Sequence, residues 1–243
     1  MTNLVSLDKN THRDLRVISN KVDAESAQAN LVPMSLSECV KAATTLPIVF
    51  AKNVQTGAFS LIAMAGFESG ENLFYRNHKW DGHYVPLNVR RQPFFAGQDE
   101  STSEPILCIN QDSPALSTSQ GERLFDEAGF ETDFLKSSYQ LVRHLVDDLP
   151  ATHGFVEKMA ELRLIVPMNL DIRFDNGEQA TVRGLYTIDE EMVSRLADDQ
   201  LASLHQAKYL PAVYAMLVSL GHIPALIARR NEMNAELADV ALS

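Results

Sequence analysis

Cysteine is scarce in this sequence: only Cys39 and Cys108 occur among 243 residues. The two lie far apart in the chain and each sits in an apolar run, which favours buried free thiols and a reducing compartment. The disulfide framework that staples small secreted domains is therefore excluded, and one disulfide between these two residues is the open alternative.

Long apolar runs are also missing. A membrane-spanning helix needs about 20 consecutive apolar residues, and the most apolar segments, residues 210–220 and 223–228, are interrupted by Gly221, His222 and Pro224. The first residues contain no apolar core of signal-peptide length. We therefore expect no membrane span and a cytoplasmic location, with signal-independent export to the cell surface as the open alternative.

Several signatures of chemistry are absent as well. The chain has no G-x-G-x-x-G or Walker A loop for nucleotide phosphates, no G-x-S-x-G nucleophile elbow and no C-x-x-C pair. Its 32 acidic residues outnumber 21 basic ones, and the formal net charge of -11 argues against general nucleic-acid binding. These patterns predict no catalytic residue and no cofactor.

What remains is the composition of an ordinary globular protein, with 45% hydrophobic and 22% charged residues. Apolar runs at residues 47–51 and 58–67, separated by turn residues, predict antiparallel strands. We predict an α+β fold, with an antiparallel or mixed sheet in the first half and helices plus a β-hairpin in the second half. Residues 1–243 are expected to form a single domain with an internal boundary near 125–132.

Helix and turn signals refine this prediction. The Asn176-Gly177 pair predicts a hairpin over residues 169–188 with both turn residues at positive φ. Gly221 is expected to be the C′ residue of a helix over 208–220. The predicted helix starts are a capping box at Ser35 and Glu38, caps at Thr132, Thr152 and Asp198, and a second capping box from Thr187 to Glu190, with Pro150 ending the helix that Thr132 begins.

Residues 71–98 are the most distinctive stretch, because they are basic and aromatic within an acidic chain. They contain the only tryptophan, Trp80, expected to be partly buried, together with Tyr84, Arg90 and Arg91. Guanidinium groups bind carboxylates and phosphates, and arginine and aromatic residues are enriched at interface hot spots. These four residues are the predicted binding surface for a protein or peptide partner. The competing interpretation is that both arginines form ion pairs with the acidic run at residues 99–133.

The same stretch holds a weak candidate metal site. His78, Asp81 and His83 form an H-x-x-D-x-H pattern, and imidazole with carboxylate can hold zinc or iron. The spacing matches no established site. We therefore favour a surface loop in which His83 packs against Trp80 or Tyr84, and no metal is predicted.

Blocks of residues spread over nearly the full length carry a family resemblance. They are His12-Arg13-Asp14-Leu15-Arg16-Val17, Gly70-Glu71-Asn72-Leu73-Phe74, Tyr84-Val85-Pro86, Arg90-Arg91-Gln92-Pro93-Phe94, Gly121-Glu122-Arg123-Leu124-Phe125 and Tyr214-Ala215-Met216-Leu217. With these blocks the chain resembles the SapC family of bacterial proteins, and not the peptide-transporter permease of the same name.

The resemblance implies a setting more than a mechanism. The family is named after a surface-layer-associated protein, and its members are often encoded near tryptophan-halogenase-like flavoproteins and TonB-dependent receptors, which implies nutrient uptake or peptide modification. It implies no catalytic residue. We therefore predict a non-enzymatic accessory or binding protein with a protein or peptide partner. The alternatives are a flavin- or metal-dependent enzyme in such a pathway, and a surface-layer component.

Overall fold

The computed structural model describes residues 3–19, 21, 24–77, 79–98 and 105–242. Its main sheet has five antiparallel strands in the order β12-β13-β4-β5-β3. The first half of the chain supplies β3 (Leu31–Pro33), β4 (Ile48–Lys52) and β5 (Phe59–Met64). The second half supplies a hairpin of β12 (Ile165–Arg173) and β13 (Gln179–Ile188), whose Leu185 and Tyr186 pair with Ala51 and Phe50. The predicted hairpin therefore completes the sheet that the first half begins.

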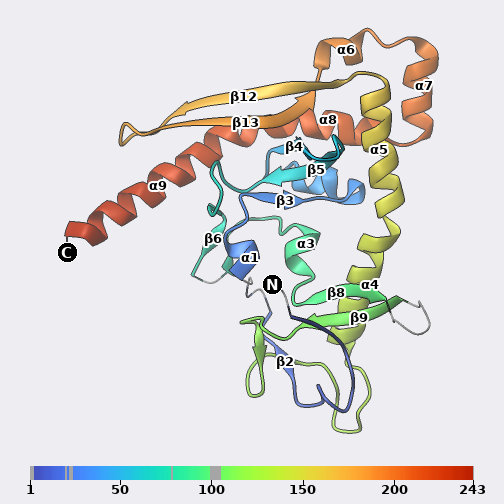
Figure 1. The fold of residues 1–243 in the computed structure, drawn as a ribbon, viewed down its shortest axis with the longest axis vertical. Coiled ribbons are helices and arrows are strands. Elements are labelled where there is room, and N and C mark those ends of the chain that lie inside the picture. Colours follow the sequence, from blue (N-terminus) through green and yellow to red (C-terminus); the bar gives the residue numbers. More distant parts are fainter. Residues whose placement is uncertain (1–2, 20, 22–23, 78, 99–104, 243) are drawn as a thin grey trace.

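A smaller layer lies below the main sheet in Figure 1. It contains β1 (Leu4–Ser6), β9 (Pro105–Asn110) and β8 (Phe94–Gln98), antiparallel in the order β1-β9-β8. In this order β8 is an edge strand. Among the short strands, β10 (Leu116–Ser117) and β11 (Glu122–Arg123) each pair with β2 (Arg16–Val17), which lies between them. β6 (Tyr75–Arg76) and β7 (Lys79–Trp80) form a separate pair.

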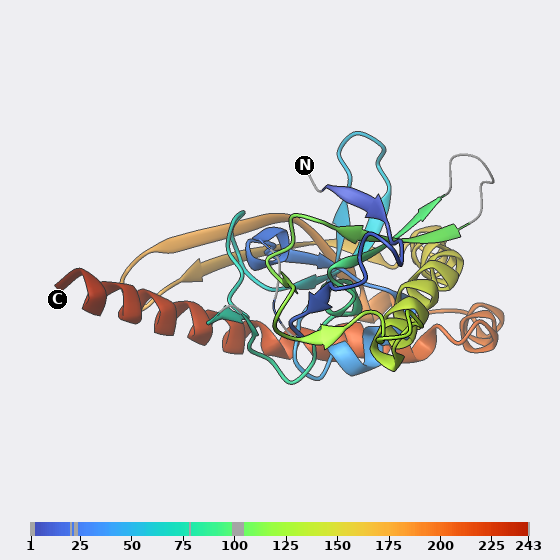
Figure 2. The same ribbon diagram turned by 90° about the horizontal axis from the view of Figure 1, so that it is seen from below.

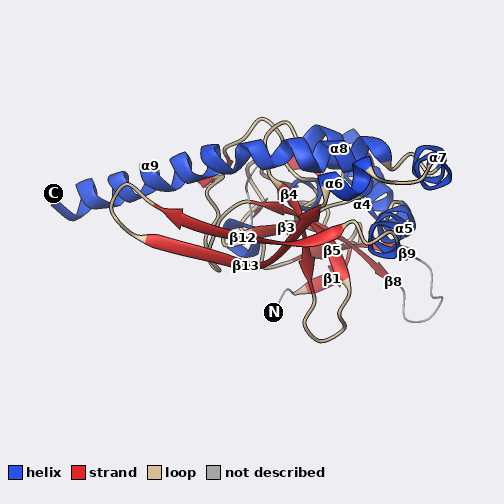
Figure 3. Ribbon diagram, turned by 90° about the horizontal axis from the view of Figure 1, so that it is seen from above, coloured by secondary structure: helices blue, strands red, loops and turns tan. Residues whose placement is uncertain are grey.

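Helices cover the sheets on two sides. α8 (Leu210–Ser219) lies over one face of the main sheet and continues through a 3-10 turn, η2 (Leu220–His222), into α9 (Ile223–Leu242). α9 extends beyond the rest of the molecule beside the β12–β13 hairpin (Figure 2, Figure 3). α4 (Asp133–Asp147) and α5 (Leu149–Glu161) run end to end from the lower layer to the main sheet (Figure 1). The shorter helices are α1 (Ala24–Ala27), η1 (Leu36–Glu38), α2 (Cys39–Ala42), α3 (Leu87–Arg90), α6 (Glu190–Ser194) and α7 (Asp198–Gln206).

Buried side chains form two clusters, one in each layer. The larger cluster includes Phe50, Phe155 and Met216, from the main sheet, α5 and α8. The smaller cluster draws on residues 5–17, 94–125 and 134–142 and packs α4 against β8 and β9. The fold is therefore α+β, as predicted. The segment 125–132 lies within the smaller cluster, because Phe125 is buried there and Thr132 caps α4. Cys39 and Cys108 are both buried and free, so the alternative of a disulfide is wrong.

One helix in the described ranges, Leu210–Asp239, is long and apolar enough to cross a membrane by length and composition alone. We expected this helix to be interrupted at Gly221, His222 and Pro224, but η2 connects α8 directly to α9. Pro224 lies in the first turn of α9, where a missing backbone N–H costs little. Gly221 lies outside the left-handed region, so its predicted role as a C′ residue is wrong. Part of this segment belongs to the core, because Ala212, Val213 and Met216 are buried.

The other end signals had mixed outcomes. The caps at Thr132 and at Ser35 with Glu38 are confirmed. Asn176 does not adopt positive φ: Asp175-Asn176-Gly177 forms a three-residue loop in which Gly177 alone has positive φ, +88°. Three predicted helix starts were wrong. α5 begins before Thr152, with Pro150 in its first turn. The N-cap of α6 is Asp189 and not Thr187, and the N-cap of α7 is Ala197 and not Asp198. Each correction moves a start by a few residues, because several adjacent polar side chains could serve as caps.

Two glycines that the sequence treats alike should respond oppositely to alanine. Gly177→Ala is expected to lower the free energy of unfolding by about 1–2 kcal/mol, because a side chain there is held in the left-handed region. Gly221→Ala is expected to raise it by about 0.5–1 kcal/mol, because a helical conformation costs alanine less entropy than glycine. A Cβ at either position meets open space, so steric overlap does not confuse the comparison. Urea unfolding of the two variants measures both values, and equal signs would contradict the backbone assignment.

Candidate functional site

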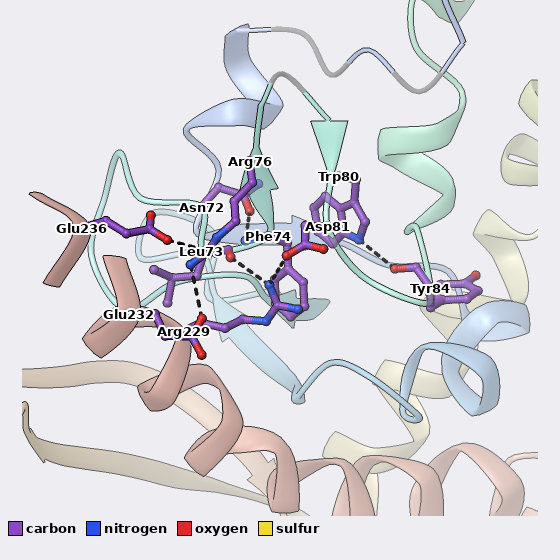
Figure 4. Close-up of polar contacts among 10 residues, drawn as sticks. All are labelled: Asn72, Leu73, Phe74, Arg76, Trp80, Asp81, Tyr84, Arg229, Glu232 and Glu236. Atoms are coloured by element: carbon purple, nitrogen blue, oxygen red, sulfur yellow. Dashed lines mark hydrogen bonds and ion pairs between the residues drawn. The ribbon is translucent and has the colours of Figure 1, made fainter. Parts of the chain in front are cut away.

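Trp80 anchors the loop that precedes α3. Its ring stacks on Phe74 with centroids 5.1 Å apart and an interplanar angle of 7°. Its Nε1 donates a hydrogen bond to the carbonyl oxygen of Tyr84 at 2.8 Å, and the side chain is partly buried (Figure 4). Both the ring face and the only polar atom of Trp80 are therefore engaged inside the fold, which places this candidate in a supporting role.

The loop beside Trp80 is tied to α9 by charged groups (Figure 4). The guanidinium group of Arg229 lies 4.4 Å from the Phe74 ring centroid and pairs with Asp81 at 3.0 Å. Arg76 pairs with Glu232 and Glu236 of the same helix, each at 3.3 Å. The positive charge of Arg76 is therefore neutralised within the fold, as is the negative charge of Asp81 from the same stretch.

The candidate metal pattern is only partly placed. His78 lies outside the described residues, His83 is exposed, and Asp81 pairs with Arg229. Within the described ranges, no group of three or more His, Cys, Asp or Glu side chains could hold a metal ion.

Glu38 and Tyr84 form a buried polar pair. Glu38 is only 2% exposed, and burial raises the pKa of its carboxyl group. One carboxylate oxygen accepts hydrogen bonds from the N–H and Oγ of Ser35, and the other accepts from the Tyr84 hydroxyl at 2.9 Å and the Leu87 N–H at 2.8 Å. Burial, together with the nearby charge of Glu38, also raises the pKa of Tyr84. Glu38 thus caps η1 and the first turn of α3 at the same time.

Arg90 and Arg91 point to different sides of α3. Successive helical residues diverge by about 100°, and Leu87 and Val89 occupy the buried side. Arg91 donates hydrogen bonds to the Asn88 side chain at 3.0 Å and the Phe94 carbonyl at 2.8 Å, and lies 4.0 Å from the Phe95 ring centroid. The side chain of Arg90 is exposed and has no hydrogen bond or ion pair with another described residue. The four predicted residues therefore do not form one surface.

Arg90 opens onto a cavity with a volume of about 550 Å³ between α2, α3 and α4. We call it the Arg90 cavity. Its lining includes Glu38 and Tyr84 at the buried side, the basic residues Lys41, Arg90 and Lys136, and His144. Two of the four predicted binding residues, Tyr84 and Arg90, thus meet in one place.

A second hollow follows the opposite side of α4. Cavities of about 340, 370 and 510 Å³ lie in succession: the first two share Ala96, Val142 and Val146, and the last two share Ile106, Leu107 and Tyr139. We call these six residues and the hollow they line the α4 groove. Arg91 lies at the end nearest α3. Tyr139 and Val146 are 40% and 42% exposed, which is unusual for large apolar side chains on an otherwise amphipathic helix.

The sequence did not lead us to predict α4 as a functional element. The available signal was the width of the apolar side, because at 100° per residue Leu141, Leu145, Val142, Val146 and Tyr139 span about 160° around the helix. An apolar side wider than the roughly 100° that a core-facing helix buries leaves apolar surface at its edges.

A comparison with protein-family models matches residues 7–226 to a family described as SapC. The match covers most of the chain, including the Arg90 cavity and the α4 groove. No curated protein and no solved structure matches the chain in the corresponding comparisons.

Proposed function

The chain belongs to the SapC family, and from this premise we propose that it is a non-enzymatic accessory protein that binds an extended segment of a partner protein in the α4 groove. The observation that carries the proposal is the position of an edge strand, β8, alongside an exposed apolar side of α4. Clefts between a strand edge and a helix bind extended peptides by adding a strand to the sheet. The partner that this arrangement fits is a chain segment with apolar side chains at alternate positions.

The backbone of β8 supports this mode of binding. The N–H of Phe94 donates to the carbonyl oxygen of Arg91, and the carbonyl oxygen of Phe94 accepts from the Arg91 side chain. Phe94 therefore turns its backbone groups away from β9, and Ala96, two residues further, turns its own groups in the same direction. Ala96 lines both of the first two cavities of the groove. An incoming strand would form hydrogen bonds with the backbone N–H and carbonyl groups of Ala96 and apolar contacts with α4.

Two features support a binding role over catalysis. Burial and the neighbouring carboxylates raise the pKa of the Cys39 thiol to about 12, which makes a thiolate nucleophile unfavourable. The carboxylate of Glu38 already accepts four hydrogen bonds from the fold. The uptake or peptide-modification setting that the family implies is part of the proposal, because such systems handle peptide segments.

Val146→Glu tests the groove directly. A library of random linear peptides displayed on phage is selected against the purified parent protein, and the best peptide is synthesised and titrated. We expect Val146→Glu to weaken its binding by about tenfold or more, because a charge would be buried against the peptide. Val54→Glu, at a residue 96% exposed between β4 and β5, is the matched control and should bind like the parent.

The outcome is decided by two observations. Hydrogen exchange at the Ala96 amide should slow when the peptide binds, because strand addition pairs that backbone. Failure to select any peptide, or equal binding by the parent and Val146→Glu, would contradict the proposal.

A further inference from the structure

The Arg90 cavity has a local charge opposite to that of the whole chain. The formal net charge of the protein is -11. The cavity nevertheless takes three basic side chains from three different helices, Lys41 from α2, Arg90 from the end of α3 and Lys136 from α4. Concave sites lined by one sign of charge concentrate ligands of the opposite sign.

The only carboxylate in the lining does not cancel this charge toward the opening. Glu38 is 2% exposed, and its two oxygens are occupied by donors from Ser35, Tyr84 and Leu87. Two other acids contact the lining: Asp133 lies 3.6 Å from Lys136 and is fully exposed to solvent, and Asp148 accepts a hydrogen bond from the Ser37 N–H at 3.0 Å. The three basic side chains of the lining therefore outnumber the two acids beside it.

Neutral polar side chains complete the lining. Ser37, Ser137 and Gln140 can donate hydrogen bonds, and His144 shares a hydrogen bond with Ser37 at 3.0 Å. A guanidinium group offers five N–H donors, and none of those of Arg90 is used by a described residue. Leu87 and Leu141 provide apolar walls, which strengthen electrostatic attraction by excluding water.

We propose that the Arg90 cavity binds an oxyanionic ligand, a carboxylate or a phosphate group, held by Arg90 with Lys41 and Lys136. Forked guanidinium groups match the geometry of either oxyanion. The floor is rigid because the Glu38–Tyr84 hydrogen bond fixes both residues beneath the opening. This site lies on the other side of α4 from the groove and does not depend on the proposed function.

The test measures thermal melting of the full chain with sodium succinate, with inorganic phosphate, and with sodium chloride at the same ionic strength and pH. The parent should melt at a higher temperature as either oxyanion is added, and the shift should saturate, because a ligand that binds only the folded state stabilises it. Arg90→Gln and Lys136→Gln should each weaken the apparent affinity by about tenfold, since each removes a charge-assisted contact.

Arg143→Gln is the matched control, because Arg143 lies on the same helix, lines the groove side and pairs with Asp147. It should keep the full shift. A shift with succinate alone assigns the site to carboxylates, and a shift with phosphate alone assigns it to phosphate groups. The proposal is overturned if neither oxyanion exceeds chloride, or if Arg143→Gln loses as much as Arg90→Gln. Should Arg90→Gln fold poorly, Lys136→Gln decides, because its ion pair is exposed.

Discussion

Replacing Glu38 with alanine is expected to lower the free energy of unfolding by about 3–5 kcal/mol, because it strands buried hydrogen-bond donors. The N–H groups of Ser35 and Leu87 cannot turn elsewhere, since each is fixed by the start of a helix. The hydroxyl groups of Ser35 and Tyr84 also lose their acceptor. Urea unfolding followed by far-UV circular dichroism measures the loss.

Graded variants separate the parts of this network. Tyr84→Phe removes one hydrogen-bond donor to Glu38, whose oxygen still accepts from the Leu87 N–H. We therefore expect the free energy of unfolding to fall by about 1 kcal/mol. Glu38→Gln keeps one good acceptor and should fall between the two. Glu191→Ala is the matched control: its pair with Arg195 is exposed on both sides, and such pairs contribute about 0–1 kcal/mol. A Glu38→Ala variant as stable as Glu191→Ala would show that Glu38 is not a double cap.

The pH dependence of this effect has a defined sign. Burial raises the pKa of Glu38 in the folded protein, so the folded state binds the proton more tightly than the unfolded state does. The contribution of Glu38 to stability is then greatest below the unfolded pKa and is lost as the pH rises through the folded pKa. The stability deficit of Glu38→Gln, which does not titrate, should therefore shrink from acidic toward neutral pH.

Two local signals predicted the local structure correctly. The Ser35–Glu38 capping box and the Thr132 cap were readable because both partners lie within three residues of each other. The second task of Glu38 could not be predicted, because Leu87 and Tyr84 lie 49 and 46 residues away. Propensity and spacing describe a side chain's neighbours in the chain, and long-range packing decides the rest.

The candidate site shows the same division. Arg90 and Arg91 were assigned to one predicted binding surface because they lie in the same basic and aromatic stretch. Because successive helical residues diverge by about 100°, Arg90 lines the Arg90 cavity and Arg91 lies at the end of the α4 groove. The side chains that line each hollow beside these arginines come partly from α4, for example Lys136 and Val146. This helix follows some 45 residues later in the chain, so the sequence near Arg90 and Arg91 could not reveal it.

Substitutions where α9 meets the rest of the fold are also expected to lower the free energy of unfolding strongly. Glu71 and Arg230 form a buried ion pair, with side chains 7% and 15% exposed. Glu71 also accepts a hydrogen bond from the Phe67 N–H at 2.6 Å, and Arg230 lies 3.8 Å from Glu178 and 5.4 Å from the Phe174 ring centroid. One arginine thus connects α9 to the loop after β5 and to the hairpin tip.

Glu71→Ala is expected to lower the free energy of unfolding by about 3–5 kcal/mol, because it leaves the Arg230 charge mostly buried without its main partner. Arg230→Ala should cost a similar amount for the converse reason. The double variant should lose less than the sum, with a coupling of about 1–3 kcal/mol between the two sites.

Hydrogen exchange shows which part of the fold loses protection when the Glu71–Arg230 ion pair is removed. Because α9 extends beyond the body (Figure 3), its amides and those of the β12–β13 tip should exchange faster in Glu71→Ala, with the β4–β5 core unchanged. Glu236→Ala, which removes an exposed partner of Arg76 on the same helix, is the control and should leave both regions protected. If the two single losses simply add, or if protection falls equally in β4 and β5, the ion pair does not hold α9 in place, and its contacts with the hairpin and with the loop beside Trp80 must do so.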